Sequence, residues 1–198
     1  MKKLIVFAFL ATTISMSAGT AMAESIRGKL GVTGKIGFLS PADNTAEFFD
    51  NRTDTGFVGG GGLIYGIDDH IAIELDVTRT SFGSDTGDFG VTNVSFGGQY
   101  RFALQQRQLV PYIGVGLDIL ATDYDFIGGG RSDVDTTVGV HVNGGIDFFF
   151  QRNLALTVEA KVVAAPDAKI TARPSGNSVG DFDPSSFSTT FGIRCFFN

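Results

Sequence analysis

The feature that most constrains this chain is an alternation of apolar and polar residues with a period of two. Successive side chains of a β-strand point to opposite faces, so this period predicts strands rather than helices. The alternation recurs in eight runs, separated by segments rich in Gly, Asp and Ser that are typical of turns and loops. The runs occupy residues 29–38, 56–66, 71–78, 93–102, 112–119, 137–148, 154–162 and 187–197.

The segments between these runs alternate in length. Long, polar and mostly aspartate-rich segments are expected to form loops, and short ones tight turns. The long segments are 41–55, 83–91, 121–135 and 164–185, and the short ones are 67–70, 103–108 and 151–153. An even number of strands with alternating short turns and long loops is typical of bacterial outer-membrane barrels, whose termini both lie on the periplasmic side.

A soluble barrel also alternates, but it turns its apolar face inward. Here the polar face is rich in Gly, Ser and Thr with scattered charges of both signs, whereas a water-facing exterior would carry many more Lys and Glu. The apolar face is almost free of charge along the middle of each run, as a surface in contact with hydrocarbon must be. The sequence therefore predicts an all-β fold, an eight-stranded antiparallel transmembrane β-barrel in the bacterial outer membrane.

The first 23 residues have the features of a secretory signal peptide. Lys2 and Lys3 form a basic start, residues 4–11 are apolar, and Ala21-Met22-Ala23 fits the small-x-small pattern of a cleavage site. The apolar stretch is far shorter than the roughly 20 residues of a membrane-spanning helix. We expect residues 1–23 to be the signal peptide and residues 24–198 to form one barrel domain.

Charge and cysteine content narrow the partners and the source of stability. Without residues 1–23 the chain has 13 basic and 21 acidic residues, a net charge of −8. This balance argues against nucleic acid, which favours a basic surface. Cys195 is the only cysteine, so no internal disulfide is available and closure of the sheet must stabilise the fold.

Three segments resemble the outer membrane protein W (OmpW) family of eight-stranded barrels from Gram-negative bacteria. Residues 63–75, LIYGIDDHIAIEL, resemble the strand–turn–strand of that family. Residues 110–116, VPYIGVG, resemble a strand with the pattern R-P-Y-V-G-x-G. Residues 144–148, GGIDF, followed by Gln151-Arg152-Asn153, resemble a turn with the pattern G-V-D-Y-x-x-N-R. The order and spacing of the three agree with the family over nearly all of residues 24–198.

The resemblance implies a narrow, porin-like passive channel with an apolar section that opens sideways and admits small hydrophobic molecules. It also implies contact with outer-membrane lipids and lipopolysaccharide, and assembly by the barrel assembly machinery with periplasmic chaperones. Some members of the family serve as receptors for phages or colicins. The chain differs from the family in having no tryptophan, and in having Val91-Thr92-Asn93-Val94 where a proline is usual. The terminal aromatic that signals assembly corresponds to Phe197, with Asn198 beyond it.

The charged side chains on the polar face are the candidate functional residues. One interpretation is a selectivity ring for ions or polar solutes. The other is a network of ion pairs that fills a lumen too narrow for water, and the mixed signs favour it, while the many inward glycines would leave space open. The candidates are Lys29, Lys35, Glu74, Asp76, Arg101, Asp118, His141, Asp147, Glu159, Lys161 and Arg194.

Nothing in the sequence points to catalysis, to a metal or to a cofactor. His141 is the one histidine expected at mid-barrel, and a lumenal hydrogen-bonding role suits it better than a catalytic one. The four glycines 59–62 are followed by no Lys-Ser/Thr pair and no helix, so they are not a phosphate-binding loop. The alternative to a channel is a non-conducting structural, adhesive or receptor barrel that acts through its extracellular loops.

The predicted loops and strand ends carry two further sets of residues. Loop carboxylates could hold divalent cations shared with lipopolysaccharide, although we favour the simpler explanation that they keep solvated loops soluble. These carboxylates are Asp43, Glu47, Asp50, Asp54, Asp85, Asp88, Asp123, Asp125, Asp133, Asp135, Asp181 and Asp183. Aromatic residues near strand ends are expected to form girdles at the membrane interfaces. They are Phe38, Phe57, Tyr65, Phe82, Tyr100, Phe102, Phe148 and Phe197.

Overall fold

The structure is a computed structural model, and it describes most of the chain beyond the predicted signal peptide. The described residues are 25–42, 44–46, 49–51, 55–84, 87–102, 108–126, 131–172 and 178–197. No helix in this part of the chain is long and apolar enough to cross a membrane. The predicted signal peptide lies outside the described residues.

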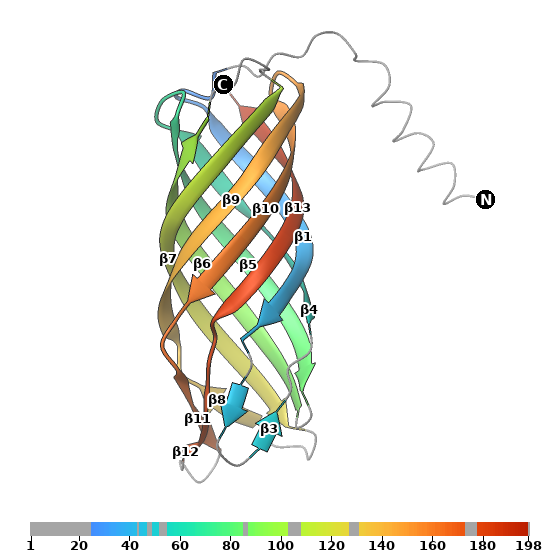
Figure 1. Ribbon diagram of the computed structural model, residues 1–198, viewed down its shortest axis with the longest axis vertical. Helices are drawn as coiled ribbons and strands as arrows, with labels where there is room; N and C mark the ends of the chain where they lie inside the picture. The colour runs from blue at the N-terminus through green and yellow to red at the C-terminus, as the bar shows by residue number, and fades with distance from the viewer. Residues whose placement is uncertain are drawn as a thin grey trace, which may run out of the picture.

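Eight long strands form a closed antiparallel barrel (Figure 1). Their order around the barrel is β1, β4, β5, β6, β7, β9, β10 and β13, and β13 pairs with β1 over the full length of both, from Leu30 opposite Phe197 to Pro41 opposite Ser186. The predicted fold class is confirmed. The strands are β1 (Leu30–Pro41), β4 (Gly56–Gly66), β5 (Ile71–Ser84), β6 (Gly87–Arg101), β7 (Leu109–Phe126), β9 (Thr137–Gln151), β10 (Leu154–Ala164) and β13 (Ser186–Phe197).

The alternation in the sequence sorts side chains between the outside and the inside of the barrel. In β1 the apolar Ile36 and Phe38 are 59% and 60% exposed, whereas Lys35, which precedes Ile36, is 5% exposed. The same pattern of exposed apolar and buried polar side chains continues around the barrel. An apolar exterior around a polar interior is the arrangement of a membrane-spanning barrel, because the outer face meets lipid.

One end of the barrel is extended by strands that the sequence pattern does not reveal. β2 (Asn44–Ala46) pairs with β3 (Phe49–Asn51), and β8 (Arg131–Val134), β11 (Ala168–Ala172) and β12 (Ser178–Phe182) continue the sheet from the end of β7. β5 and β6 also pair up to Ser84 opposite Gly87. The prediction that residues 83–91 and 121–135 are loops is therefore wrong for most of these positions. Their backbone groups continue the strand ladder, which Gly and Asp side chains do not prevent.

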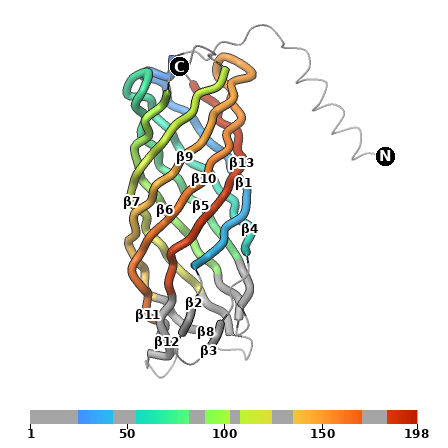
Figure 2. Tube along the Cα trace, viewed as in Figure 1, coloured from blue at the N-terminus to red at the C-terminus, as the bar shows by residue number. Residues whose placement is uncertain are grey.

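The start of β1, the end of β13 and the turn at 67–70 between β4 and β5 lie at the opposite end of the barrel from β8, β11 and β12 (Figures 1 and 2). The turn at 67–70 is closed by Asp68, whose Oδ1 accepts hydrogen bonds from the backbone N–H groups of His70 and Ile71 at 2.7 and 2.6 Å. These two bonds favour the ionised carboxylate and lower the pKa of Asp68 below its ordinary value of 3.8. The predicted turns at 67–70 and 151–153 are confirmed, and the turn at 103–108 lies mostly outside the described residues.

Candidate functional site in the barrel lumen

An apolar cluster closes the lumen at the end that carries the short turns. Phe149 and Phe196 stack with ring centroids 5.9 Å apart, and both side chains are almost fully buried. Ile26 reaches the cluster from the segment before β1, which turns at Gly28 with a φ of +71° that favours glycine. The cluster consists of Ile26, Ile64, Ala72, Phe149, Ala155 and Phe196. All six side chains are apolar and offer a passing ion no polar partner.

Two buried arginines lie next to this cluster, on the side toward the middle of the lumen. They share one carboxylate. Asp147 of β9 accepts a hydrogen bond from Arg101 Nη2 of β6 at 2.6 Å and from Arg194 Nη1 of β13 at 3.1 Å. Arg194 also bonds Glu74 Oε1 at 2.8 Å. Both guanidinium groups lie against the ring of Tyr112, with Arg194 4.9 Å from its centroid. The three strands β6, β9 and β13 are therefore joined across the lumen.

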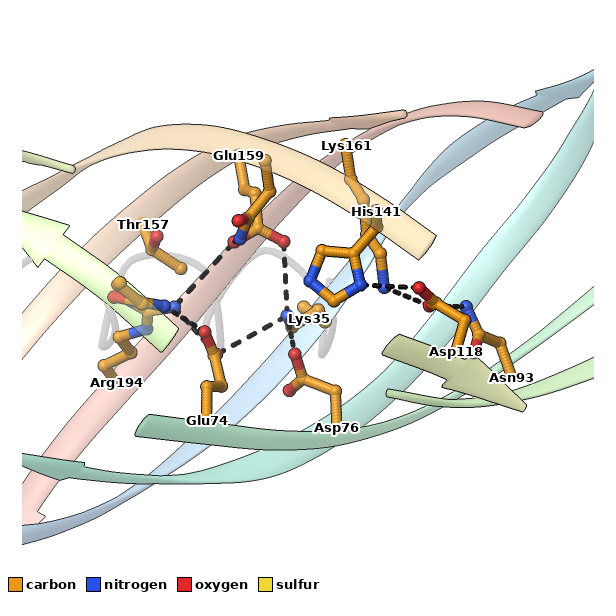
Figure 3. Close-up of polar contacts among 12 residues, drawn as sticks. Lys35, Glu74, Asp76, Asn93, Asp118, His141, Thr157, Glu159, Lys161 and Arg194 are labelled. Atoms are coloured by element: carbon orange, nitrogen blue, oxygen red, sulfur yellow. Dashed lines mark hydrogen bonds and ion pairs between the residues drawn. The ribbon is translucent and has the colours of Figure 1, made fainter. Parts of the chain in front are cut away.

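The next layer is centred on Lys35, as Figure 3 shows. Its Nζ lies 2.8 Å from Asp76 Oδ2, 3.4 Å from Glu159 Oε1 and 3.7 Å from Glu74 Oε1. The second oxygen of Glu159, Oε2, accepts hydrogen bonds from the Tyr112 hydroxyl and from the side-chain amide of Asn143, each at 2.9 Å. Lys35 of β1 thus draws three carboxylates from two strands, β5 and β10, to one point, so that each of these buried carboxylates has a cationic partner.

A third group of charges is centred on Asp118 of β7. His141 Nδ1 lies 2.5 Å from Asp118 Oδ2, and Lys161 Nζ lies 2.8 Å from Oδ1 (Figure 3). Asn93 Nδ2 donates a further hydrogen bond to Oδ1 at 2.7 Å. The arrangement satisfies Asp118 with three partners. It supports a structural, hydrogen-bonded role for His141.

Inward-facing glycines make room for these side chains. Gly62 is paired with Asp76 and Gly116 with His141, and a Cβ on either glycine would collide with the opposing side chain. A Cβ on Gly145 would lie 2.5 Å from the Tyr112 hydroxyl. The expectation that inward glycines leave the lumen unfilled is therefore wrong at these positions, because neighbouring polar side chains occupy the space.

Most of the predicted lumen residues lie in these layers. The buried ones are Lys35, Glu74, Asp76, Arg101, Asp118, His141, Asp147, Glu159 and Arg194, and Lys161 is mostly buried. Lys29 precedes β1 and is only partly buried. Sequence reasoning did not select Tyr112, Gln99, Asn143 or Phe149. All four lie at inward-facing positions of their strands, which is the signal that the sequence offers. The sequence does not give the register between strands, so it does not show that these side chains contact the charged ones.

The outer half of the lumen, beyond Lys35, contains a cavity of about 40 Å³. Lys35, Asp76 and Glu159 form its floor, and Lys161 and Asn93 lie in its wall. Apolar side chains and hydroxyl groups from the surrounding strands complete the wall. The cavity extends toward the end that carries β8, β11 and β12, where Ser186 at the start of β13 and Pro184 just before it also line it.

The predicted loop and girdle residues lie only partly in the described part of the chain. Asp43, Glu47, Asp54 and Asp85 are outside it. Asp123 is exposed and lies 3.4 Å from Arg79. The girdle aromatics whose side chains are described are 40% or more exposed. Among the described residues no three His, Cys, Asp or Glu side chains are grouped to hold a metal ion.

A family model decides what class of protein this geometry belongs to. The model described as "Outer membrane protein beta-barrel domain" matches residues 7–194. The chain belongs to this family. It is a β-barrel of the bacterial outer membrane, and the predicted location and the predicted resemblance to eight-stranded outer-membrane barrels are confirmed. No curated protein sequence matches the chain.

Solved structures of outer-membrane proteins share the fold. The chain is 16% identical to OprG from Pseudomonas aeruginosa, with a TM-score of 0.70, and the match covers 90% of this chain and 99% of OprG. For AlkL the values are 14% identity, a TM-score of 0.58, and 91% and 94% coverage. For Ail, the attachment invasion locus protein of Yersinia pestis, the identity is 12% and the TM-score is 0.54. That match covers 86% of this chain and 99% of Ail. Identities this low show a common fold and leave activity to be argued from the site.

Proposed function

We propose that this protein is a non-conducting outer-membrane barrel that acts through its extracellular end. The observation that carries the proposal is the pair of layers at the periplasmic end. The Arg101–Asp147–Arg194 ion pairs lie across the lumen, and the Phe149–Phe196 stack lies beneath them. A hydrated ion would have to break buried ion pairs and then pass an apolar layer. Breaking a buried pair by loss of one partner typically costs about 3–5 kcal/mol.

The extracellular end supports the same proposal. Strands β5, β6 and β7 extend beyond the outward-facing Arg79–Asp123 pair, and β8, β11 and β12 widen the sheet there. Ail, a barrel of the same fold, is named for attachment and invasion. An extended, paired outer sheet is a surface suited to contact with partners. We therefore favour a structural, adhesive or receptor role over ion transport.

Single-channel recording in a planar bilayer tests the proposal. The mature protein should show no discrete conductance steps. A variant that thins both layers, with Glu74→Ala and Arg194→Ala among the charges and Phe149→Ala and Phe196→Ala in the apolar cluster, should conduct if it folds, which its heat-dependent migration on a gel would establish. Discrete steps from the unaltered protein would overturn the proposal.

A second candidate is sideways passage of small hydrophobic molecules, which needs no ion path. The observation that favours it is a thin wall beside the cavity at residues 59–62 of β4, where neither face carries a side chain. Gly60 lies opposite Lys35 on β1 and opposite Thr78 on β5, and both of these residues line the cavity. Uptake of an apolar dye into vesicles that contain the protein should then fall when Gly59→Val fills the outer face of this wall. Uptake that is equal in both proteins would remove this candidate.

A further inference from the structure

The segment 25–29, which precedes β1, completes the apolar cluster at the end of the lumen that carries the short turns. Five members of the cluster lie on barrel strands, and these are Ile64, Ala72, Phe149, Ala155 and Phe196. The sixth, Ile26, belongs to the segment 25–29 and is 5% exposed. One side chain from outside the barrel strands is therefore part of the layer that closes this mouth.

The hydrogen bonds of the segment 25–29 hold it at one edge of the mouth. Gly28 donates its backbone N–H to the carbonyl of Gly66 at 2.7 Å, and Gly66 donates to the carbonyl of Lys29 at 3.0 Å. The hydroxyl of Ser25 donates a hydrogen bond to Asp69 Oδ1. Both acceptor residues on the barrel side, Gly66 and Asp69, lie at the end of β4 and in the turn that follows it.

Two glycines fit the segment to the barrel. Gly28 has a φ of +71°, where a side chain would strain the backbone although no atom lies within 4 Å of its Cβ position. At Gly66 a Cβ would collide with the carbonyl oxygen of Ile26. The placement of Ile26 therefore depends on backbone freedom at one glycine and on empty space at the other.

The segment has far fewer stabilising contacts than the strands of the barrel. Ile26 is its one buried side chain, whereas Ser25 and Arg27 are exposed. In contrast, β1 is paired along its length with β13 on one side and with β4 on the other. Parts of a protein with few buried apolar contacts open at a lower free energy than its core. These are the features of a segment that opens locally.

We propose that the segment 25–29 is a plug, hinged at Gly28, which closes the periplasmic mouth and opens without unfolding of the barrel. When it opens, the strand residues of the apolar cluster become accessible from the periplasm. The arginine layer stays in place in both states, because Arg101, Asp147 and Arg194 all lie on barrel strands. The plug therefore goes beyond the proposed function, since it controls access to the apolar layer and not the passage of ions. Access and conductance are measured separately, so either proposal can fail alone.

Thiol labelling of a cysteine beneath the plug tests the proposal. Ala72 is fully buried and is paired with Gly66, against which the plug lies. With Cys195→Ser to remove the native thiol, Ala72→Cys in the refolded protein should react slowly with a water-soluble sulfonated maleimide. Adding Ile26→Ser should speed this reaction by about tenfold or more, because burial of one isoleucine side chain favours the closed plug by at least that factor.

Two glycine substitutions should open the plug by a different route. Gly28→Ala strains the hinge and Gly66→Ala displaces the backbone of Ile26, so each should also speed the labelling of Ala72→Cys. Both leave every side chain of the cluster in place, which keeps the test decisive if Ile26→Ser disturbs folding. The matched control is Gly34→Ala, where the Cβ position is equally free but φ is not positive, and it should leave the rate unchanged.

A cysteine at the other end of the lumen distinguishes opening of the plug from loosening of the whole barrel. Val163 is buried and lines the outer cavity, so Val163→Cys should react at the same rate with and without Ile26→Ser. A rise in rate that is confined to Ala72→Cys supports the plug. An unchanged rate at Ala72→Cys, or an equal rise at both positions, would overturn the proposal.

Discussion

At the scale of single residues, Asp147 is the counter-ion on which the arginine layer depends. Its carboxylate is fully buried and is bonded to both Arg101 and Arg194. Neutralising it leaves two buried guanidinium groups with one carboxylate fewer between them. A buried charge without a partner is strongly destabilising, whereas an exposed pair contributes little.

We therefore expect Asp147→Asn to lower the free energy of unfolding by about 3–5 kcal/mol. The matched control is Asp123→Asn, whose pair with Arg79 is more than half exposed on both sides, and which should cost less than about 1 kcal/mol. Urea unfolding from lipid vesicles, followed by circular dichroism because the chain has no tryptophan, gives both values. Equal effects of the two substitutions would show that the arginine layer is not a stabilising unit.

Glycines provide a second prediction at this scale, because their inward and outward positions differ in free space. A Cβ at Gly145 would lie 2.5 Å from Tyr112 and from the carbonyl oxygen of Val158. A Cβ at Gly34, on the lipid-facing side of β1, would have nothing within 4 Å. Gly145→Ala should therefore destabilise the barrel by about 1–3 kcal/mol through overpacking, and Gly34→Ala should be nearly neutral. The same unfolding experiment measures both, and a neutral Gly145→Ala would mean that Tyr112 can move away.

At the scale of the strands, β13 has two roles that can be separated. It closes the barrel by pairing with β1, and its Phe197 is the predicted aromatic signal for the assembly machinery. Phe191 lies on the same lipid-facing side of the same strand and is similarly exposed, at 53% against 49%. Packing alone should make the two residues equivalent.

We predict that Phe197→Ala reduces the amount of protein assembled in the outer membrane several-fold, and that Phe191→Ala does not. Refolding into detergent, which bypasses the assembly machinery, should be affected equally by the two substitutions. Immunoblots of outer-membrane fractions, with heated and unheated samples, measure the assembled form. If both variants assemble alike, Phe197 is not the assembly signal.

The strands themselves could be predicted because each buries one face against polar neighbours and exposes the other to lipid, so period two is imposed along their whole length. The outer extensions of β5, β6 and β7 lie beyond the lipid, where no such alternation is required. The sequence therefore assigns Asp88 to a loop, although it pairs with Gly83 within the sheet. The lumen charges were predictable by parity. Their partners were not, because Arg194 and Glu74 are 120 residues apart and meet only through the closed barrel.

At the scale of the whole molecule, the apolar exterior defines how the barrel lies in the membrane. On β5 the outward positions run from Leu75 and Val77, which are 43% and 49% exposed, to Arg79 and Ser81 further along the strand. Arg79 pairs with Asp123 and bonds Thr92 on the same outer surface. Charged side chains are disfavoured against hydrocarbon, so this position marks the outer limit of the lipid-facing band.

The same substitution at two heights on β5 tests this placement. Leu75→Arg puts a charge within the band and should destabilise the barrel by about 2–4 kcal/mol, the range for arginine near the midplane of a bilayer. Ser81→Arg, on the same strand and the same face, lies beyond Arg79 and should cost about 0–1 kcal/mol. Unfolding in vesicles measures both, with Arg79 as the natural precedent for a charge at that height. A soluble barrel would tolerate arginine equally at both positions of its outer face. A larger cost for Leu75→Arg than for Ser81→Arg is therefore the expected sign of lipid contact. Equal costs would contradict this placement in the membrane.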